Sequence, residues 1–500
     1  MDKKRWSFRR VVYLILLIFL PLPALAGGPL EVRNGRALSY GKRPIVYRYD
    51  LGMLGNLNNE EAVTLVEELF STWESASSAS INFKQDKPGF VDEDIDNNNF
   101  KKFLKPKSEE DLNGFTVIVF DENGLLLDEF LGTGGGNAVL GIGGPVILSK
   151  GGFHKLVESQ IVLNGRFING IDSATDREVS LDTYRRTILH EVGHAIGLDH
   201  TQINVEAIET GALQDIKDTV PLMFPRAVSD LFVLKQDDVS SVSFLYPADS
   251  KLQNFGQIKG KVFREDGIKP VLGANVVARN INNPKEVAIS CVSDFLKRKN
   301  GEYVIFAIPP GDYTLEIEPI STEFVSGASA GTVGPKVGPY TKSLNDKSFQ
   351  DPVPKGFYTG NNLPVNANQS DAKILEVRGG DTLDGIDIIG ALLQSASTTS
   401  NLNVMLKTPF TITPKGGKAN IEVSITDSQN LVKCKVLLTN DLAVTIRPSE
   451  FVFRPGKLAK TVSVKFSKQA AQDILDSGLS SVEINFNCAN GSSSALTLPL

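Results

Sequence analysis

The pattern of hydrophobic and polar positions predicts an α+β fold, with both strands and helices, for the first half of the chain. Short apolar runs that are typical of buried strands alternate there with segments of helical periodicity. Strands are predicted at residues 45–49, 81–83, 115–120 and 159–164. A helix is predicted over 60–76, where apolar side chains recur at helical spacing (Val63, Val66, Leu69, Phe70 and Trp73). A second helix is predicted over 183–198, with Asp182 as its N-cap.

After residue 247 the helical periodicity gives way to short β runs separated by turn residues. Runs at 258–263, 276–278, 303–305, 311–315 and 386–389 predict a first sandwich over 256–394, with a long insertion at 322–370. A polar linker is predicted at 395–400, and alternation over 402–500 predicts a second sandwich. The predicted fold class is therefore multidomain, with an α+β domain over 37–248 followed by two all-β sandwich domains.

The first 26 residues are predicted to be a cleaved signal peptide. A basic head precedes the apolar run 11–20, and Ala24-Leu25-Ala26 supplies small residues at the cleavage position. The alternative is an uncleaved membrane anchor, for which the apolar run is short. No later stretch reads as a membrane span, so we expect an exported chain, secreted or periplasmic, without stable membrane insertion.

Charge and cysteine content narrow the expected partners and the redox compartment. The 500-residue chain has a net charge of −6, and removing the signal peptide, which carries +4, makes it −10. An acidic chain without basic tracts gives no reason to expect nucleic acid as a partner. Cys434 and Cys488 lie in the same β-rich segment, where export permits a disulfide between them, and Cys291 would remain a free thiol.

Three of the four histidines lie between residues 190 and 200, in HEVGHAIGLDH. His190 and His194 are four residues apart and therefore share one face of a helix. Gly197 can end that helix and turn the chain, which would bring His200 round as a third ligand. Three nitrogen ligands with an open fourth position are typical of a catalytic zinc site, and Glu191 is placed to act as the general base. A bare HExxH can arise by accident, but Gly197 and His200 make coincidence a poor explanation.

Two other polar segments are candidates for ligand binding. The run Asp92-Glu93-Asp94-Ile95-Asp96 resembles a calcium-binding loop, but it lacks the glycine of the sharp turn and the closing glutamate. It lies in a polar stretch, 86–114, that is expected to be an exposed loop, so Ca²⁺ is the weaker interpretation and a solvated loop the favoured one. The glycines at 132–136 lack the spacing of a phosphate-binding loop.

The stretch from His190 to His200 resembles the metzincin zinc signature HExxHxxGxxH. Pro221-Leu222-Met223-Phe224-Pro225 resembles the Met-turn of the matrixins, and the likeness extends over roughly Lys42 to Pro247. It implies a zincin-type, matrixin-like zinc metallopeptidase domain, with one catalytic Zn²⁺ on the three histidines. Met223 would support the metal site from beneath without binding the ion, whereas taken alone it would be an ordinary core methionine.

The same resemblance implies a substrate-binding edge strand at 139–142 (Val139, Leu140, Gly141 and Ile142), which would pair with an extended peptide. Two features of animal matrixins are missing. The edge strand lacks the histidine of the structural zinc site, and His154 nearby is expected to be an exposed loop residue. No cysteine precedes the histidine cluster, so the propeptide cysteine switch is missing too.

The β-rich half carries weaker resemblances. Residues 256–321 resemble carboxypeptidase-regulatory-like sandwiches through Gly260-Lys261-Val262, Gly273-Ala274-Asn275-Val276 and the turn at 309–313. That likeness implies binding or spacing rather than chemistry. The last segment resembles Ig-like domains only at the level of fold class, which says little about function.

Together these patterns predict a secreted zinc-dependent endopeptidase that hydrolyses peptide bonds of protein or peptide substrates. Water activated by zinc would be the nucleophile and Glu191 the general base. Two alternatives stay open. One is a non-enzymatic surface or adhesion protein with a vestigial zinc domain, whose sandwiches bind a surface partner. The other is a processing protease dedicated to one exported protein.

Overall fold

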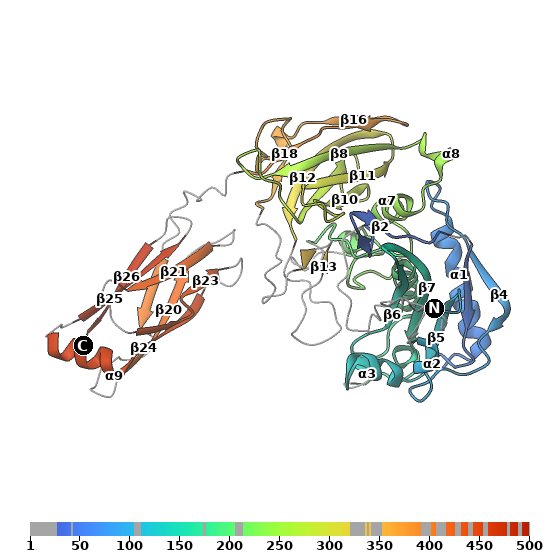
Figure 1. Ribbon diagram of the computed structural model, residues 1–500, viewed down its shortest axis with the longest axis horizontal. Coiled ribbons are helices and arrows are strands. Elements are labelled where there is room, and N and C mark those ends of the chain that lie inside the picture. Colours follow the sequence, from blue (N-terminus) through green and yellow to red (C-terminus); the bar gives the residue numbers. More distant parts are fainter. Residues whose placement is uncertain are drawn as a thin grey trace, which may run out of the picture. The chain divides into compact units, whose positions relative to one another are not determined.

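The computed structural model resolves the chain into two compact units, residues 1–392 and 393–500. It describes residues 28–41, 44–104, 112–173, 177–205, 214–320, 336–337, 340–341, 353–391, 402–406, 417–425, 432–438, 444–453, 459–477, 481–488 and 493–499. The predicted signal peptide, the predicted linker at 395–400 and most of the predicted insertion at 322–370 lie outside the described residues. The protein is a multidomain α+β molecule with several β-sheets (Figure 1).

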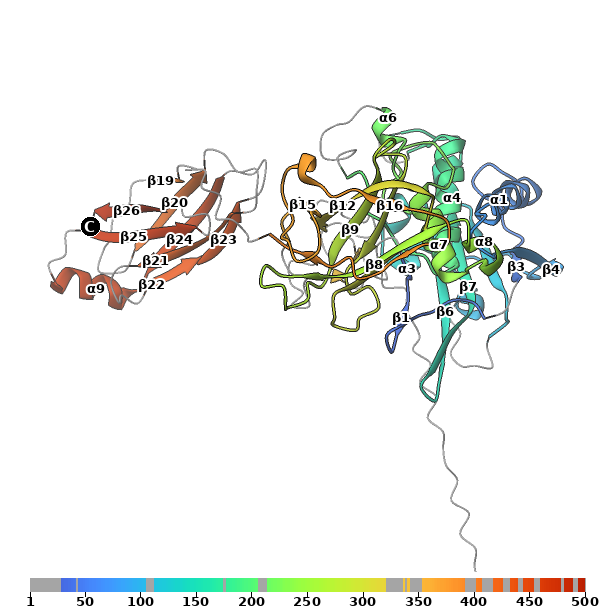
Figure 2. The same cartoon turned by 90° about the horizontal axis from the view of Figure 1, so that it is seen from above.

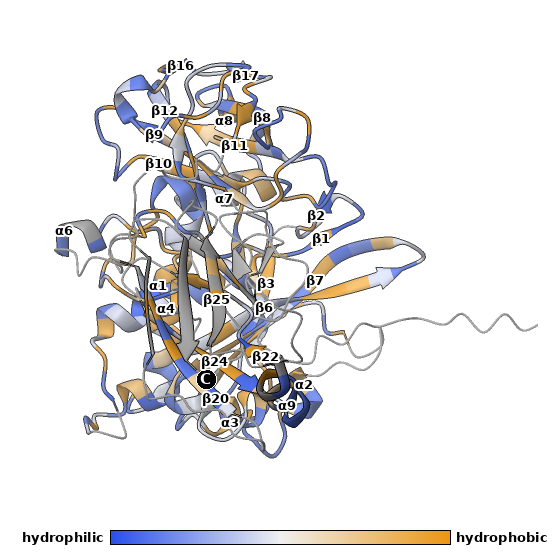
Figure 3. Cartoon of the chain, turned by 90° about the vertical axis from the view of Figure 1, so that its left-hand side faces the viewer, coloured by the Kyte–Doolittle hydropathy of each residue, from blue (hydrophilic) through white to orange (hydrophobic). Residues whose placement is uncertain are grey.

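A five-stranded sheet forms the framework of the N-terminal α+β domain, with the strand order β4-β3-β5-β7-β6. The strands are β3 (Ile45–Tyr49), β4 (Phe83–Phe90), β5 (Thr116–Asp121), β6 (Gly141–Lys150) and β7 (Phe153–Asn164). All neighbours pair in parallel except β6, which runs antiparallel to β7. The predicted strands agree with β3, β5 and β7, although β7 begins earlier, and the strand predicted at 81–83 instead starts at Phe83. Strands β6 and β7 continue past the others as a long hairpin (Figures 2 and 3).

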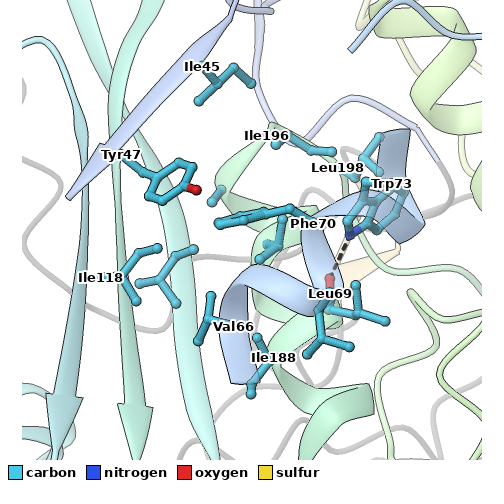
Figure 4. Packing of buried hydrophobic residues seen from close by; sticks show 14 of the residues in the cluster. Ile45, Tyr47, Val66, Leu69, Phe70, Trp73, Ile118, Ile188, Ile196 and Leu198 are labelled. Atoms are coloured by element: carbon cyan, nitrogen blue, oxygen red, sulfur yellow. Dashed lines mark hydrogen bonds between the residues drawn. The ribbon is translucent and has the colours of Figure 1, made fainter. Parts of the chain in front are cut away.

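Two helices cover one face of this sheet, α1 (Asn59–Glu74) and α4 (Leu181–Ala195). Helix α1 begins at a capping box, in which Asn58 and Glu61 satisfy each other's backbone N–H groups. Its apolar stripe packs between the sheet and α4, as Figure 4 shows for Val66, Leu69, Phe70 and Trp73 beside Tyr47, Ile118 and Ile188. The Trp73 indole Nε1 donates a hydrogen bond of 3.0 Å to the Leu189 carbonyl oxygen of α4. The two helices are therefore fixed to each other as well as to the sheet.

The opposite face of the sheet is also buried, which corrects the expectation of an exposed loop over residues 86–114. Ile95, Phe100 and Leu104 pack with α2 (Lys101–Leu104) and α3 (Leu125–Leu131) against Val117 and Val119 of β5. A parallel strand such as β5, buried along its whole length, needs cover on both faces. Among the described residues of the stretch, 86–90 belong to β4, and the polar residues between 92 and 99 form bends and turns beside these apolar anchors, which obscures the burial in the sequence pattern.

Helix α4 begins two residues earlier and ends three residues sooner than predicted. The N-cap is Ser180, whose side chain accepts a hydrogen bond from the Thr183 N–H, whereas Asp182 lies in the first turn and pairs with Arg185. The helix ends at Ala195, and Gly197 takes a φ of +95°, a left-handed conformation that favours glycine. The predicted turn at Gly197 is thus present, but outside the helix.

The first β-sandwich follows the α+β domain. One sheet contains β9 (Ala274–Asn280), β10 (Ala288–Val292), β12 (Gly311–Pro319), β15 (Gly356–Phe357) and β16 (Leu375–Val377). The other contains β8 (Gly256–Phe263), β11 (Glu302–Ile308), β17 (Thr382–Leu383) and β18 (Ile388–Ile389). Apolar side chains of both sheets form a shared core, including Ile258, Val276, Ile289, Ile305 and Leu315.

This sandwich and the α+β domain belong to one compact unit. The fold changes between residues 248 and 256, but the two parts pack together. Helix α7 (Gln236–Leu245) packs on β10 and β11. Ser240 Oγ donates to the Phe306 carbonyl oxygen at 2.6 Å, and the Phe244 ring packs edge-on against Phe295. Helix α8 (Asp249–Leu252) joins the two folds.

Several short elements complete the described part of this unit. They are β1 (Val32–Arg33), β2 (Arg36–Ala37), α6 (Gln214–Lys217), β13 (Lys336–Val337), β14 (Tyr340–Thr341) and the 3-10 turns Gly135–Asn137, Gly165–Ile168 and Gln369–Asp371.

The second unit contains two four-stranded antiparallel sheets, in the orders β19-β20-β24-β22 and β23-β21-β25-β26. Their bounds are Leu402–Leu406 (β19), Gly417–Ile425 (β20), Val432–Leu438 (β21), Val444–Arg447 (β22), Glu450–Phe453 (β23), Ala459–Phe466 (β24), Ser481–Cys488 (β25) and Ser493–Pro499 (β26), with α9 at Lys468–Ser477. Cys434 is disulfide-bonded and lies opposite Cys488 in the β21–β25 ladder. Cys291, in the first unit, is a buried free thiol. The pairing of Cys434 with Cys488 stays a prediction.

The corrected start of α4 makes a testable prediction. Ser180→Ala removes the N-cap acceptor and should lower the free energy of unfolding by about 1 kcal/mol. Asp182→Ala should have a smaller effect, because it removes a first-turn charge and an exposed ion pair only. Thermal or denaturant unfolding of both variants measures the difference. An equal or larger loss in Asp182→Ala would argue for Asp182 as the cap.

Candidate metal centre

Helix α4 and the turn behind it bring three imidazoles to one point. His190 and His194 share a helical face, and Gly197 turns the chain so that His200 meets them. The Nε2 atom of His190 lies 3.0 Å from Nε2 of His194 and 3.1 Å from Nε2 of His200, and the latter two are 3.1 Å apart. Within the part of the chain that the structure describes, this is the one group of three or more His, Cys, Asp or Glu side chains with converging ligand atoms.

Hydrogen bonds of the Nδ1 atoms determine the tautomers of His190 and His194. His190 Nδ1 lies 2.8 Å from the Leu222 carbonyl oxygen, and His194 Nδ1 lies 2.9 Å from that of Leu198. A carbonyl oxygen only accepts, so each Nδ1 carries the proton and each Nε2 is left with a lone pair. Two lone pairs 3.0 Å apart repel unless a cation lies between them. The histidine group therefore fits a metal ion such as zinc.

Burial keeps the three imidazoles neutral, which is the state that binds metal. Burial lowers the pKa of His194 to about 4, and it lowers the pKa of His190 and His200 well below the usual value, with a further contribution from the neighbouring histidines. Glu191 behaves in the opposite sense, because burial raises its pKa to about 8 while the Gly143 N–H lowers it. A nearby divalent cation would favour the charged carboxylate.

Met223 packs against α4 at Gly193, and the supporting role that the matrixin resemblance implies for it stays a prediction. A Cβ atom on Gly193 would come within 2.3 Å of Met223 Sδ and 2.9 Å of Trp73 Cζ2, so a larger residue at this position of α4 would force one of them to shift. Met223 is buried and joins the hydrophobic core that includes Trp73. The structure thus brings Met223 against the helix that carries His190 and His194.

Two buried charged residues that sequence reasoning did not single out hold the Met-turn in place. The Asp238 carboxylate accepts hydrogen bonds from the backbone N–H groups of Leu222 (2.8 Å) and Met223 (2.9 Å). Arg186 of α4 donates to the carbonyl oxygens of Pro221 (2.6 Å) and Leu231 (2.8 Å). Arg186 could have been found from the sequence as a charged residue on the apolar face of the predicted helix. Asp238 could not, because an acidic residue at the start of a helix normally only complements the helix dipole.

The edge strand beside α4 begins at Gly141, which corrects the expected range. Val139 and Leu140 precede β6, and Gly141 and Ile142 open it. Strand β6 lies at the end of the sheet order, so one of its edges has no strand partner among the described residues. Gly143 packs against α4 so closely that a Cβ atom would lie 2.3 Å from the Glu191 carbonyl oxygen. The glycines of β6 therefore let the strand approach the metal helix.

The remaining candidate ligands lie elsewhere. His154 is in β7 near the hairpin turn, not in a loop, and its Nδ1 lies 2.7 Å from Ser149 Oγ. The carboxylates of the 92–96 run do not gather as a metal-binding group; Asp96 instead accepts hydrogen bonds from the backbone N–H groups of Asn98 and Asn99. No helix among the described residues has both the length and the apolar character of a membrane span.

Comparisons with known proteins add no family assignment. No family model matches the sequence, and no curated protein matches it. Among solved structures, a DUF3823 family protein from Bacteroides uniformis is 12% identical, with 49% of this chain and 98% of that chain covered and a TM-score of 0.15. BcpA, the major pilin subunit of Bacillus cereus, is 11% identical over 48% of this chain and 67% of its own (TM-score 0.14). The adhesin InvE of Yersinia pseudotuberculosis is 11% identical over 50% and 59% (TM-score 0.17). Scores this low leave the chemistry to be argued from the site.

The contact beneath α4 makes a second prediction. Gly193→Ala should displace Met223 or Trp73 and lower the free energy of unfolding by about 1–3 kcal/mol, with weaker zinc binding. Gly144→Ala is the matched control, since a Cβ atom there meets nothing within 4 Å. Unfolding curves and zinc titrations measure both effects. Wild-type stability and zinc affinity in Gly193→Ala would contradict the packing described.

Proposed function

We propose that the protein is an exported zinc-dependent endopeptidase of the matrixin-like metzincin type. The observation that carries the proposal is the convergence of three Nε2 atoms, at least two of them with lone pairs, at a site that Glu191 adjoins in the sequence. A purely structural zinc site is normally closed by a fourth protein ligand. The described histidine group contains three, which suits an open, catalytic position.

His190, His194 and His200 are the residues that would hold the ion. When bound, zinc acts as a Lewis acid that polarises the scissile carbonyl and lowers the pKa of water to about 7. Glu191 accepts the proton that water loses as its oxygen adds to the carbonyl carbon. Glu191 then returns that proton to the amine as the C–N bond breaks. Met223 supports the two helical ligands from below without contacting the reacting atoms.

The unpaired edge of β6 is the proposed position of the substrate backbone. An extended peptide can add to an open strand edge through main-chain hydrogen bonds. Gly141 and Ile142 open this strand next to Glu191, since a Cβ atom on Gly141 would lie 3.2 Å from Glu191 Cγ. Binding of this kind recognises the main-chain N–H and C=O groups of the ligand, which favours protein or peptide substrates in an extended conformation.

The role of Glu191 is tested by Glu191→Gln, which keeps the shape of the side chain but removes the base. Zinc content and folding should stay at wild-type levels, and cleavage of a mixed peptide library should fall by about 10²–10⁴-fold. Glu129→Gln is the control, because Glu129 is exposed on α3, on the far side of the sheet. Unchanged cleavage by Glu191→Gln would contradict the mechanism.

The same library separates the alternative functions. Bound zinc without cleavage of any peptide would favour a surface or adhesion protein with a vestigial zinc domain. Cleavage confined to a few related sequences would favour a processing protease dedicated to one exported protein. Cleavage of many sequences, lost with a chelator and restored by zinc, is the outcome expected from the proposal.

Metal binding itself predicts a linked change in stability. Zinc at a hundred times its dissociation constant should stabilise the wild-type chain by about 2.7 kcal/mol, because it binds the folded state. His194→Ala removes one ligand and should lose this stabilisation, whereas His154→Ala should keep it. Thermal unfolding with and without zinc measures the shift, and an equal shift in both variants would place the ion elsewhere.

A further inference from the structure

The loop that follows His200 is polar in sequence and yet fully buried. Residues 201–204, Thr-Gln-Ile-Asn, have exposed fractions of 0%, 1%, 1% and 1%. Loops normally run over the surface, because a buried loop must satisfy its backbone and polar side chains internally. Other parts of the chain must therefore cover this loop.

The cover comes from the outer face of two strands of the first sandwich. Val276, Ala278, Ile289 and Cys291 face the sandwich core, so by strand alternation their neighbours face outward. The register places Ser290 opposite Val277 and Ala288 opposite Arg279, which groups the four outward residues. We call Val277, Arg279, Ala288 and Ser290 the outer β9–β10 patch.

Three of the four loop residues lie against this patch. Ile203 packs in a buried cluster with Val277 and Ala288. Arg279 Nη1 donates a hydrogen bond of 2.8 Å to Asn204 Oδ1, and Thr201 Oγ1 lies 3.3 Å from Ser290 Oγ. The loop is therefore held by apolar contact in its middle and by polar contacts at both ends.

The other side of the loop rests on the segment that contains the Met-turn. The Thr201 N–H donates to the Met223 carbonyl oxygen at 3.0 Å, and Asn204 Nδ2 donates to Thr219 Oγ1 at 2.8 Å. Asn204 takes a φ of +57°, so the chain turns sharply there. The loop after His200 is thus clamped between the sandwich and the Met-turn segment.

The orientation of His200 depends on the backbone that carries it more than the orientations of His190 and His194 do. His190 and His194 are each oriented by a hydrogen bond from Nδ1 to a carbonyl oxygen. His200 Nδ1 is buried and has no hydrogen-bond partner among the described residues. The usual device for fixing a ligating imidazole is a bond from its second nitrogen. For His200 the backbone that carries it must supply the orientation instead.

We propose that the outer β9–β10 patch is a positioning element of the metal centre, which sets His200 through the loop 201–204. The inference rests on the proposed zinc site and assigns the first sandwich a part in building it. The sandwich is then a fixed component of the site, in contrast to the binding or spacing role that its sequence resemblance implied.

The test compares two valines on one strand of the full chain. Val276 and Val277 are both fully buried on β9, but Val277 contacts Ile203 whereas Val276 faces the sandwich core. Val277→Ala should weaken zinc binding about 10-fold, as the loss of a supporting partner does at other metal sites. It should also shift the d–d spectrum of the Co²⁺-substituted protein. Val276→Ala should lower the unfolding midpoint but leave zinc affinity and the Co²⁺ spectrum unchanged.

A second pair of variants, with smaller changes to the side chain, tests the same inference if the valine variants fail to fold. Ser290→Ala removes a hydroxyl of the outer β9–β10 patch, and Ser240→Ala removes a hydroxyl of the same domain interface that bonds to Phe306 instead. Only Ser290→Ala should weaken zinc binding, by a smaller factor than Val277→Ala.

The outcomes separate this inference from the proposed peptidase. Equal zinc affinities in Val276→Ala and Val277→Ala, whether both weakened or both unchanged, would overturn the positioning role. Zinc bound without any peptide cleavage would overturn the peptidase, while the variant pairs would still decide the positioning role. A wild-type chain that binds no zinc would overturn both.

Discussion

The architecture around α4 depends on one electrostatic constraint. His190 and His194 hold their protons on Nδ1 and so direct lone pairs at each other across 3.0 Å, with His200 completing the group. Such an arrangement is unfavourable without a cation and favourable with one, so the three-histidine group could hold a metal ion such as zinc. The segment 221–225, the turn at Gly197 and the buried loop 201–204 all lie next to these three residues.

Close packing on both sides of α4 gives that constraint its rigidity. Gly143 of β6 touches the backbone of Glu191 on one side, and Met223 touches Gly193 on the other. A Cβ atom on either glycine would clash with its neighbour, so both contacts are as close as glycine allows. Asp238 and Arg186 extend the rigidity into the Met-turn through hydrogen bonds to its backbone. Buried charges of this kind are tolerated because each is well bonded.

Much of the local structure was predictable because it follows from short-range patterns. Helical spacing located α1, apolar runs located β3 and β5, and the spacing of His190, His194 and His200 located the candidate metal site. Where the prediction was wrong, the local sequence favoured more than one structure. Ser180 and Asp182 are both good N-caps, and only the backbone path chooses between them. The 86–114 stretch reads as solvated because its few buried side chains lie among many polar ones.

The sequence by itself predicted which side chains form the candidate metal site, because ligand chemistry and helical spacing are properties of neighbouring residues. Tertiary structure alone decided what supports those ligands. The outer β9–β10 patch meets the loop after His200 from about 75–90 residues farther along the chain, and no local periodicity encodes such a contact. The α+β domain and the first sandwich differ in their sequence patterns on either side of residues 248–256. Tertiary packing nevertheless joins them into one compact unit. Long-range packing depends on how surfaces match in space, and a linear pattern does not record that match.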